Sequence, residues 1–170
     1  MAGSNQPSSK GRKLTLVLFG LTVFVLALSV PGSLQYAREH GGLYLFSEHF
    51  FEDIPKRLTG PGRFRFVLQP LIAIILGIRS GRADARAGLP PYFYTVLFRR
   101  ELRGEMVKNG FFTIVNLMLM GVLIDSVCQW LILGTSYPGP ALVVGPVLIA
   151  TPYTTSRALA NRLSRPRKEE

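Results

Sequence analysis

The chain has 170 residues, 48% of them hydrophobic, and its 15 arginines and 5 lysines outweigh 10 acidic residues to give a net charge of +10. A pI near 10.4 also occurs in nucleic-acid-binding proteins, but the basic residues do not alternate with aromatic residues on one face, so we expect no nucleic-acid partner. The hydrophobic residues are gathered into blocks, which is typical of a membrane protein and excludes an ordinary soluble domain.

Four apolar blocks predict an all-α integral membrane protein with four transmembrane helices plus amphipathic interfacial helices. A helix needs about 20 apolar residues to cross the hydrocarbon core of a bilayer. The blocks lie at about 14–30, 66–78, 111–133 and 141–155, within a single membrane domain over residues 14–163. The polar segments on either side, 1–13 and 164–170, are expected to be disordered and cytoplasmic.

The first block has two interpretations. A basic start, an apolar run and small residues at Ala27 and Ser29 describe a secretory signal peptide, which would be cleaved. The length of the run favours a retained transmembrane helix, and Pro31 to Ser33 is typical of a helix stop. We therefore expect a spanning helix, with cleavage of residues 1–29 as the alternative.

The segment after the first block predicts a helix on the outer membrane surface. Over residues 42–58, apolar side chains fall at helical spacing with acidic residues between them: Leu43, Phe46, Phe50 and Ile54. A short helix packed on the ends of the spans would have the same pattern.

The second block is short for a spanning helix and could instead be re-entrant or interfacial. Arg65 and Arg79 could extend to the two headgroup layers and let it cross. A small residue then recurs every four positions, which predicts a helix-packing face formed by Ala73, Gly77, Gly81 and Ala85. We expect this helix to continue into the cytoplasm, with arginines on roughly the opposite face, and to end at the prolines Pro90 and Pro91.

Six arginines of the cytoplasmic loop are candidate contacts to anionic lipid headgroups. A second surface helix is predicted over residues 92–108, where aromatic and aliphatic residues precede a basic cluster. The candidates are Arg79, Arg82, Arg86, Arg99, Arg100 and Arg103. The alternative is that these arginines only fix the topology of the chain.

Asp125 is the most unusual residue, because it lies in the third block about 12 Å of helix rise from the nearer interface. An aspartate at the centre of a spanning helix costs about 2.5–3.5 kcal/mol. Gln129 shares its face and Gln69 is the nearest polar candidate on another helix, so the three form a possible intramembrane polar site. Since no lysine or arginine lies inside a predicted span, we expect a protonated, hydrogen-bonded Asp125 that holds helices together; a proton or cation site is the alternative.

The fourth block contains Pro140, Pro146 and Pro152. The last two each remove a backbone donor, so the helix should kink or break. Freed carbonyls could then line a solute path, although prolines are also common in spanning helices.

The distribution of basic residues predicts the orientation. With the N-terminus inside, 15 of the 20 basic residues lie in cytoplasmic segments, so we expect both termini in the cytoplasm. The preference for arginine over lysine would suit a GC-rich bacterial genome, which favours a bacterial inner membrane.

No motif points to catalysis. The chain has no nucleophile elbow or phosphate-binding glycine loop, and His49 with Asp53 is too small a set for a zinc site. We therefore expect no enzyme, no catalytic residues, no cofactor and no metal. The leading hypothesis is a non-enzymatic membrane component that packs against a membrane-protein partner or a second copy through residues 73–85; the alternative is a small transporter or proton-coupled module using Asp125 and the fourth block.

Overall fold

The computed structural model describes residues 9–165, and these residues form helices and loops without a strand. The all-α prediction is therefore confirmed for the described part of the chain. Its helices are α1 (Ser9–His40), α2 (Glu48–Glu52), α3 (Ile54–Thr59), α4 (Arg65–Arg86), α5 (Tyr92–Phe98), α6 (Arg100–Leu133) and α7 (Pro138–Leu163). Residues 9–13, which we expected to be disordered, are helical, and the disorder expected for residues 1–8 and 166–170 concerns segments outside the described residues.

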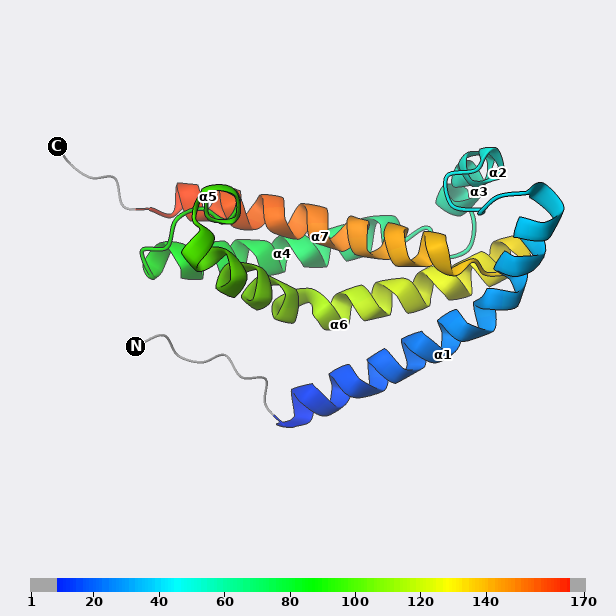
Figure 1. Cartoon of the computed structure of the whole chain (residues 1–170). Coiled ribbons are helices and arrows are strands. Elements are labelled where there is room, and N and C mark those ends of the chain that lie inside the picture. The colour runs from blue at the N-terminus through cyan, green and yellow to red at the C-terminus, as the bar shows by residue number, and fades with distance from the viewer. Residues whose placement is uncertain (1–8, 166–170) are drawn as a thin grey trace.

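Three long helices form the body of the molecule. Helices α4, α6 and α7 lie lengthwise beside one another, and α1 crosses them at an angle (Figure 1). Following the chain, α4 and α7 run in the same direction and α6 runs in the opposite one (Figure 1). The most extensive contact joins α4 to α7, so two helices far apart in the sequence form the centre of the bundle.

Within residues 9–165, three helices are long and apolar enough to cross a membrane: Gly11–His40 of α1, then α4 and α6. The short second block therefore belongs to a helix of 22 residues that continues well past residue 78, as we expected. Helix α7 has 26 residues but is not among the three, because its prolines, threonines and tyrosine dilute its apolar residues. These helices support a membrane location.

Helix α1 packs on the bundle through polar residues spaced seven positions apart. Thr22, Ser29 and Tyr36 are buried, and the Thr15 hydroxyl lies 2.8 Å from Asn116 Oδ1 on α6. Thr22 and Ser29 donate to backbone carbonyls four residues earlier in their own helix, so their hydroxyls are satisfied without water. A seven-residue spacing keeps such a stripe on one face where two helices cross with a left-handed twist.

The expected helix stop at Pro31 is wrong, because α1 continues to His40 with Pro31 inside it. The added turns carry Tyr36 into an aromatic cluster, where its ring lies 5.3 Å from the ring of Tyr44 and 5.7 Å from that of Tyr137. This packing stabilises the segment beyond the proline.

The two expected surface helices are shorter than the pattern indicated. The outer segment forms α2, with Ser47 as its N-cap, and then α3, whose first turn holds Pro55. A proline cannot donate its backbone nitrogen to a preceding turn, which explains the break at Asp53. On the other side α5 ends at Phe98, and residues 100–108 belong to α6.

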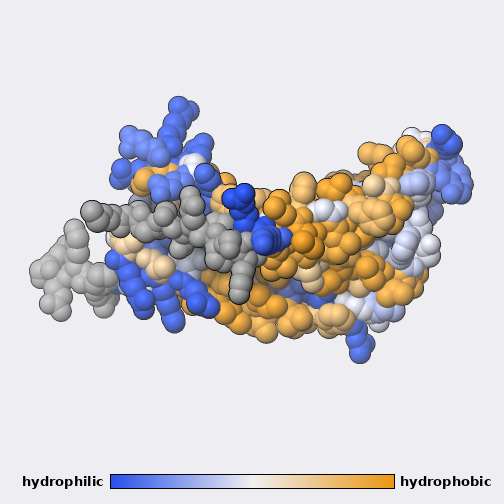
Figure 2. Space-filling view, turned by 90° about the horizontal axis from the view of Figure 1, so that it is seen from below, coloured by the Kyte–Doolittle hydropathy of each residue, from blue (hydrophilic) through white to orange (hydrophobic). Residues whose placement is uncertain are grey.

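The surface of the molecule has two hydrophilic ends and a hydrophobic middle. Figure 2 shows hydrophobic residues over the centre of the molecule, between hydrophilic residues at its two ends. Many large apolar side chains on the long helices are exposed, among them Leu16, Val17, Phe24, Val67, Leu131 and Val147. Several polar and charged residues are buried inside the bundle instead.

Two buried charge clusters as the candidate functional site

The Asp125 cluster joins α3, α4 and α6, at the end of the bundle where α2 and α3 lie. It consists of Arg57, Arg65 and Asp125 together with Gln69 and Gln129. Arg65 Nη2 lies 2.7 Å from Asp125 Oδ1, and Arg57 Nη1 lies 3.8 Å from Asp125 Oδ2. All three charged side chains are at most 3% exposed. Arg65 at the start of α4 and Arg57 on α3 thus bring two cations to one carboxylate.

This ion pair contradicts the expectation that Asp125 is buried without a cation. We expected Arg65 to extend outward to the headgroups, but it is 2% exposed and its guanidinium turns inward. A long arginine side chain at the end of a helix can reach either way, and an opposite charge inside the bundle favours the inward direction. The sequence showed an ionisable residue at position 125, but it did not show in which direction the Arg65 side chain extends.

Gln129 is brought to Asp125, as the spacing on α6 predicted. Its Nε2 donates to Asp125 Oδ2 over 2.6 Å, and its Oε1 accepts from the backbone nitrogen of Tyr137 over 2.9 Å. Gln129 therefore ties the carboxylate to the turn between α6 and α7. Gln69 is buried on α4, but its amide has no hydrogen-bond partner among the described residues, so the structure does not join it to Asp125.

Arg57, Arg65 and Asp125 together carry one more positive than negative charge, and Arg57 also interacts electrostatically with Asp53. The guanidinium of Arg57 lies 5.9 Å from the centre of the Tyr44 ring and 5.6 Å from that of Phe50. The Arg65 guanidinium lies 4.8 Å from the centre of the Phe66 ring. The faces of aromatic rings are electron-rich, so these rings offset part of the charge that one carboxylate cannot balance.

The Asp84 cluster lies at the opposite end of the bundle and joins α4 to α7. Arg157 donates from Nε to Asp84 Oδ2 over 2.6 Å and from Nη2 to Oδ1 over 3.0 Å. Its Nη1 donates to the Tyr153 hydroxyl over 3.1 Å, and its guanidinium lies 4.9 Å from the centre of the Tyr92 ring. This is a bidentate pair in which each guanidinium nitrogen has a partner.

Sequence reasoning missed the Asp84 cluster. Asp84 and Arg157 are separated by 73 residues, and Arg157 was counted only as a topology-determining charge. The sequence held one indication that Asp84 is buried: it follows Gly77 by seven positions and so shares the small-residue face of α4.

The small-residue face is covered by α7 of the same chain. A Cβ atom on Gly77 would lie 2.5 Å from the Tyr153 carbonyl oxygen, and one on Gly81 would lie 2.9 Å from Ala160 Cβ and collide with the Arg157 carbonyl oxygen. Ala73 and Ala85 are buried on the same face. This corrects our expectation that a partner or a second copy packs there, since the neighbour is α7 itself.

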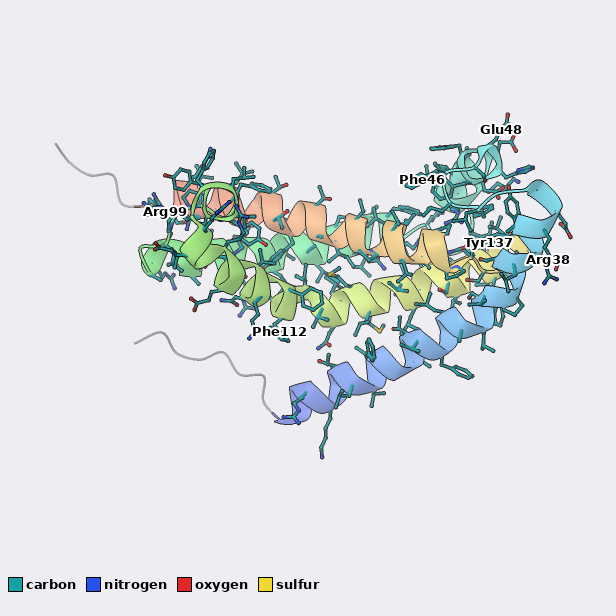
Figure 3. The ribbon with its side chains drawn as sticks, in the orientation of Figure 1. Arg38, Phe46, Glu48, Arg99, Phe112 and Tyr137 are labelled. Atoms are coloured by element: carbon teal, nitrogen blue, oxygen red, sulfur yellow. The ribbon has the colours of Figure 1, made fainter. Side chains whose placement is uncertain are left out.

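The six candidate headgroup arginines are all exposed: Arg79, Arg82, Arg86, Arg99, Arg100 and Arg103. They belong to the Asp84 end of the bundle, and Figure 3 shows Arg99 at that end while Glu48 and Tyr137 lie at the other. The expected break in α7 does not occur, because this helix is continuous through Pro146 and Pro152.

Within the described residues, no group of three or more histidine, cysteine, aspartate or glutamate side chains is placed to hold a metal ion. The single cysteine, Cys128, is buried on α6. Comparison of the chain with protein-family models, with curated proteins and with solved structures found no match. The candidate site therefore rests on the two charge clusters alone.

Proposed function

We propose that the chain is a four-span, non-enzymatic component of the bacterial inner membrane with both termini in the cytoplasm. Helix α7 supports the fourth span, because its 26 residues rise about 39 Å and it runs beside α4 in the same direction. The hydrophobic middle and hydrophilic ends of Figure 2 suit a bilayer. The arginine-rich Asp84 end then lies in the cytoplasm, in agreement with the positive-inside rule.

The observation that carries this proposal is the pairing of both buried carboxylates. Asp84 of α4 is held by Arg157 of α7, and Asp125 of α6 is held by Arg65 of α4. Each pair links two helices, which is the role of a structural contact. A proton-coupled transporter needs a carboxylate that loads and releases a proton, whereas both of these aspartates are held by arginines.

A partner protein or a second copy then requires a surface other than the covered face of α4. We propose the outward face of α1, where Gly20 and Ala27 are exposed seven positions apart among large apolar side chains. A Cβ atom on Gly20 would have no atom within 4 Å, so space is open there. Small residues on an open helix face let another helix backbone approach closely in lipid.

Two measurements test the proposal. Gly20→Leu should abolish co-purification of a partner or second copy in mild detergent, while the thermal midpoint of the chain stays at the parent value. Gly104→Leu, at another open helical position, is the matched control. Association that survives Gly20→Leu would contradict the α1 interface.

The transporter alternative is tested in reconstituted vesicles. We expect proton flux no higher than in protein-free vesicles. Flux by the parent protein, driven by a pH gradient and proportional to the amount of protein, would overturn the non-transport proposal.

A further inference from the structure

An apolar groove lies between α4 and α7, beside their buried contact. On α4 its wall is a row of residues four positions apart: Pro70, Ile74, Ile78 and Arg82. On α7 a second row of side chains runs alongside, at 147–148, 151–152, 155–156, 159–160 and 163–164. Since the two helices run in the same direction, these rows form the two walls of one groove that runs along the helices and is open along its side.

The dimensions of the groove suit one acyl chain. Its volume is 810 Å³, within the range of about 300–1,000 Å³ that is usual for sites of small molecules. Pro70 to Arg82 spans twelve residues, or about 18 Å of helix rise. A single leaflet of the hydrocarbon core is about 15 Å thick, so the groove runs from the headgroup level to near the midplane.

The charge of the groove lies at one end. Its small polar side chains are Thr151, Thr155, Ser156 and Ser164, and Arg82 at the Asp84 end is its charged residue. Arg86 continues the row of Arg82 by one turn and is also exposed. A mainly apolar groove that ends at Arg82, with Arg86 one turn beyond it, is complementary to a lipid with an anionic headgroup, and basic pockets between spanning helices on the cytoplasmic side bind such headgroups.

We propose that the groove binds one anionic phospholipid of the cytoplasmic leaflet, with its phosphate at Arg82 and Arg86 and an acyl chain along Ile78 and Ile74. The inference rests on the four-span topology, which puts Arg82 in that leaflet. The groove would thus be one defined lipid site, in addition to the general attraction of the basic end for anionic lipid. The occupant is a lipid and not a partner helix, because the groove is lined mainly by apolar side chains and is cationic at its headgroup end.

The test uses tryptophan fluorescence in vesicles of phosphatidylcholine and phosphatidylglycerol. The single native tryptophan is first removed by Trp130→Phe. A probe is then placed by Leu159→Trp, at an exposed position on the groove. We expect phosphatidylglycerol with brominated acyl chains to quench this probe with an apparent association at least about fivefold tighter than brominated phosphatidylcholine.

A matched probe controls for general attraction to the membrane surface. Phe112→Trp lies outside the groove on an exposed part of α6, at a similar depth because a Cβ atom on Gly110, two residues earlier, would lie 3.1 Å from Arg157 Nη1. Figure 3 shows Phe112 pointing away from α7. This probe should be quenched equally by the two lipids.

Charge variants then identify the headgroup site. Arg82→Gln with Arg86→Gln should reduce the lipid preference at the position-159 probe to about onefold, and Arg82→Lys should retain most of it. Arg79→Gln removes an exposed arginine that does not line the groove and should leave the preference unchanged.

Equal quenching by both lipids at position 159 would overturn the lipid site. So would quenching at position 112 but not at position 159, which would mean that a protein covers the groove. Failure of the four-span topology is recognised separately, by labelling Ser164→Cys from outside intact cells, because quenching in vesicles reports only which lipid occupies the groove.

Discussion

The two charge clusters differ in how their charges balance. In the Asp84 cluster one guanidinium meets one carboxylate through two hydrogen bonds, and Tyr153 takes the remaining nitrogen. In the Asp125 cluster two guanidiniums share one carboxylate, and only Arg65 is within 3 Å of it. The first cluster is a balanced contact between two helices, whereas in the second Asp125 faces two guanidiniums, of which Arg57 also interacts with Asp53.

The difference has an energetic consequence. Removing one partner of a buried ion pair costs about 3–5 kcal/mol, because the other charge is left without compensation. In the balanced cluster either partner is therefore equally necessary. In the unbalanced cluster the shared Asp125 should matter far more than Arg57, whose removal would reduce the excess charge.

The largest expected effect is at the balanced cluster. Arg157→Leu and Asp84→Leu should each lower the free energy of unfolding by about 3–5 kcal/mol, measured by thermal unfolding in detergent. The double variant should recover most of that loss, since two apolar side chains leave no unpaired charge. Additive losses in the double variant would mean that the pair does not act as one contact.

The second prediction concerns the shared acid. Asp125→Asn should destabilise by about 3 kcal/mol or more, because Arg65 then loses its counter-charge and Arg57 keeps only Asp53, while Arg57→Gln should cost at most about 1–2 kcal/mol from lost contacts with aromatic rings. The same unfolding measurement compares them. If the two variants lost equal amounts of unfolding free energy, Arg57 would be as necessary as Asp125, and the proposed charge distribution of the cluster would be wrong.

The contact between α4 and α7 links the two clusters, and its glycines give the third prediction. Gly77→Ala and Gly81→Ala should each destabilise by about 1–3 kcal/mol, because the added methyl group meets the backbone of α7. Gly20→Ala on α1 is the control and should be neutral or slightly stabilising. If Gly77→Ala reduced association with another molecule without reducing stability, the small-residue face of α4 would be an intermolecular interface after all.

The smallest effect is expected in residues 44–57, which contribute Arg57 to the Asp125 cluster. Although burial acts to raise it, hydrogen bonds from Lys56 and Tyr44 hold the pKa of Asp53 below its ordinary value of 3.8. Burial and the hydrogen bond to Asp53 raise the pKa of Tyr44. The contribution of Asp53 is therefore complete above about pH 4 and is lost as the pH falls through its lowered pKa.

Hydrogen exchange over residues 44–57 provides the measurement. Protection should decrease below pH 4 in the parent, after correction for the intrinsic exchange rate. Asp53→Asn should make the protection independent of pH in this range. A decrease of the same size in both proteins would place the titrating group elsewhere.

Periodicity was sufficient to predict the four long helices but not all of their ends, because segregated apolar blocks and a four-residue spacing of small residues report directly on local structure, whereas the end of α1 depends on packing beyond Pro31. It could not predict which helix covers the small face, since α7 is separated from α4 by more than fifty residues. The spacing of Gly77 and Asp84 could have indicated a buried carboxylate on that face. The inward turn of Arg65 could not be predicted, because it depends on a carboxylate that only the folded chain brings near.

Labelling of single cysteines tests the four-span arrangement that puts the two clusters at opposite faces of the membrane. In a Cys128→Ser background, Glu48→Cys and Thr135→Cys lie at the Asp125 end, and Arg99→Cys and Ser164→Cys lie at the Asp84 end. We expect a membrane-impermeant reagent to label the first two in intact cells and the last two only after permeabilisation. Labelling of positions 135 and 164 from the same side would contradict the account, because α7 would then not cross the membrane.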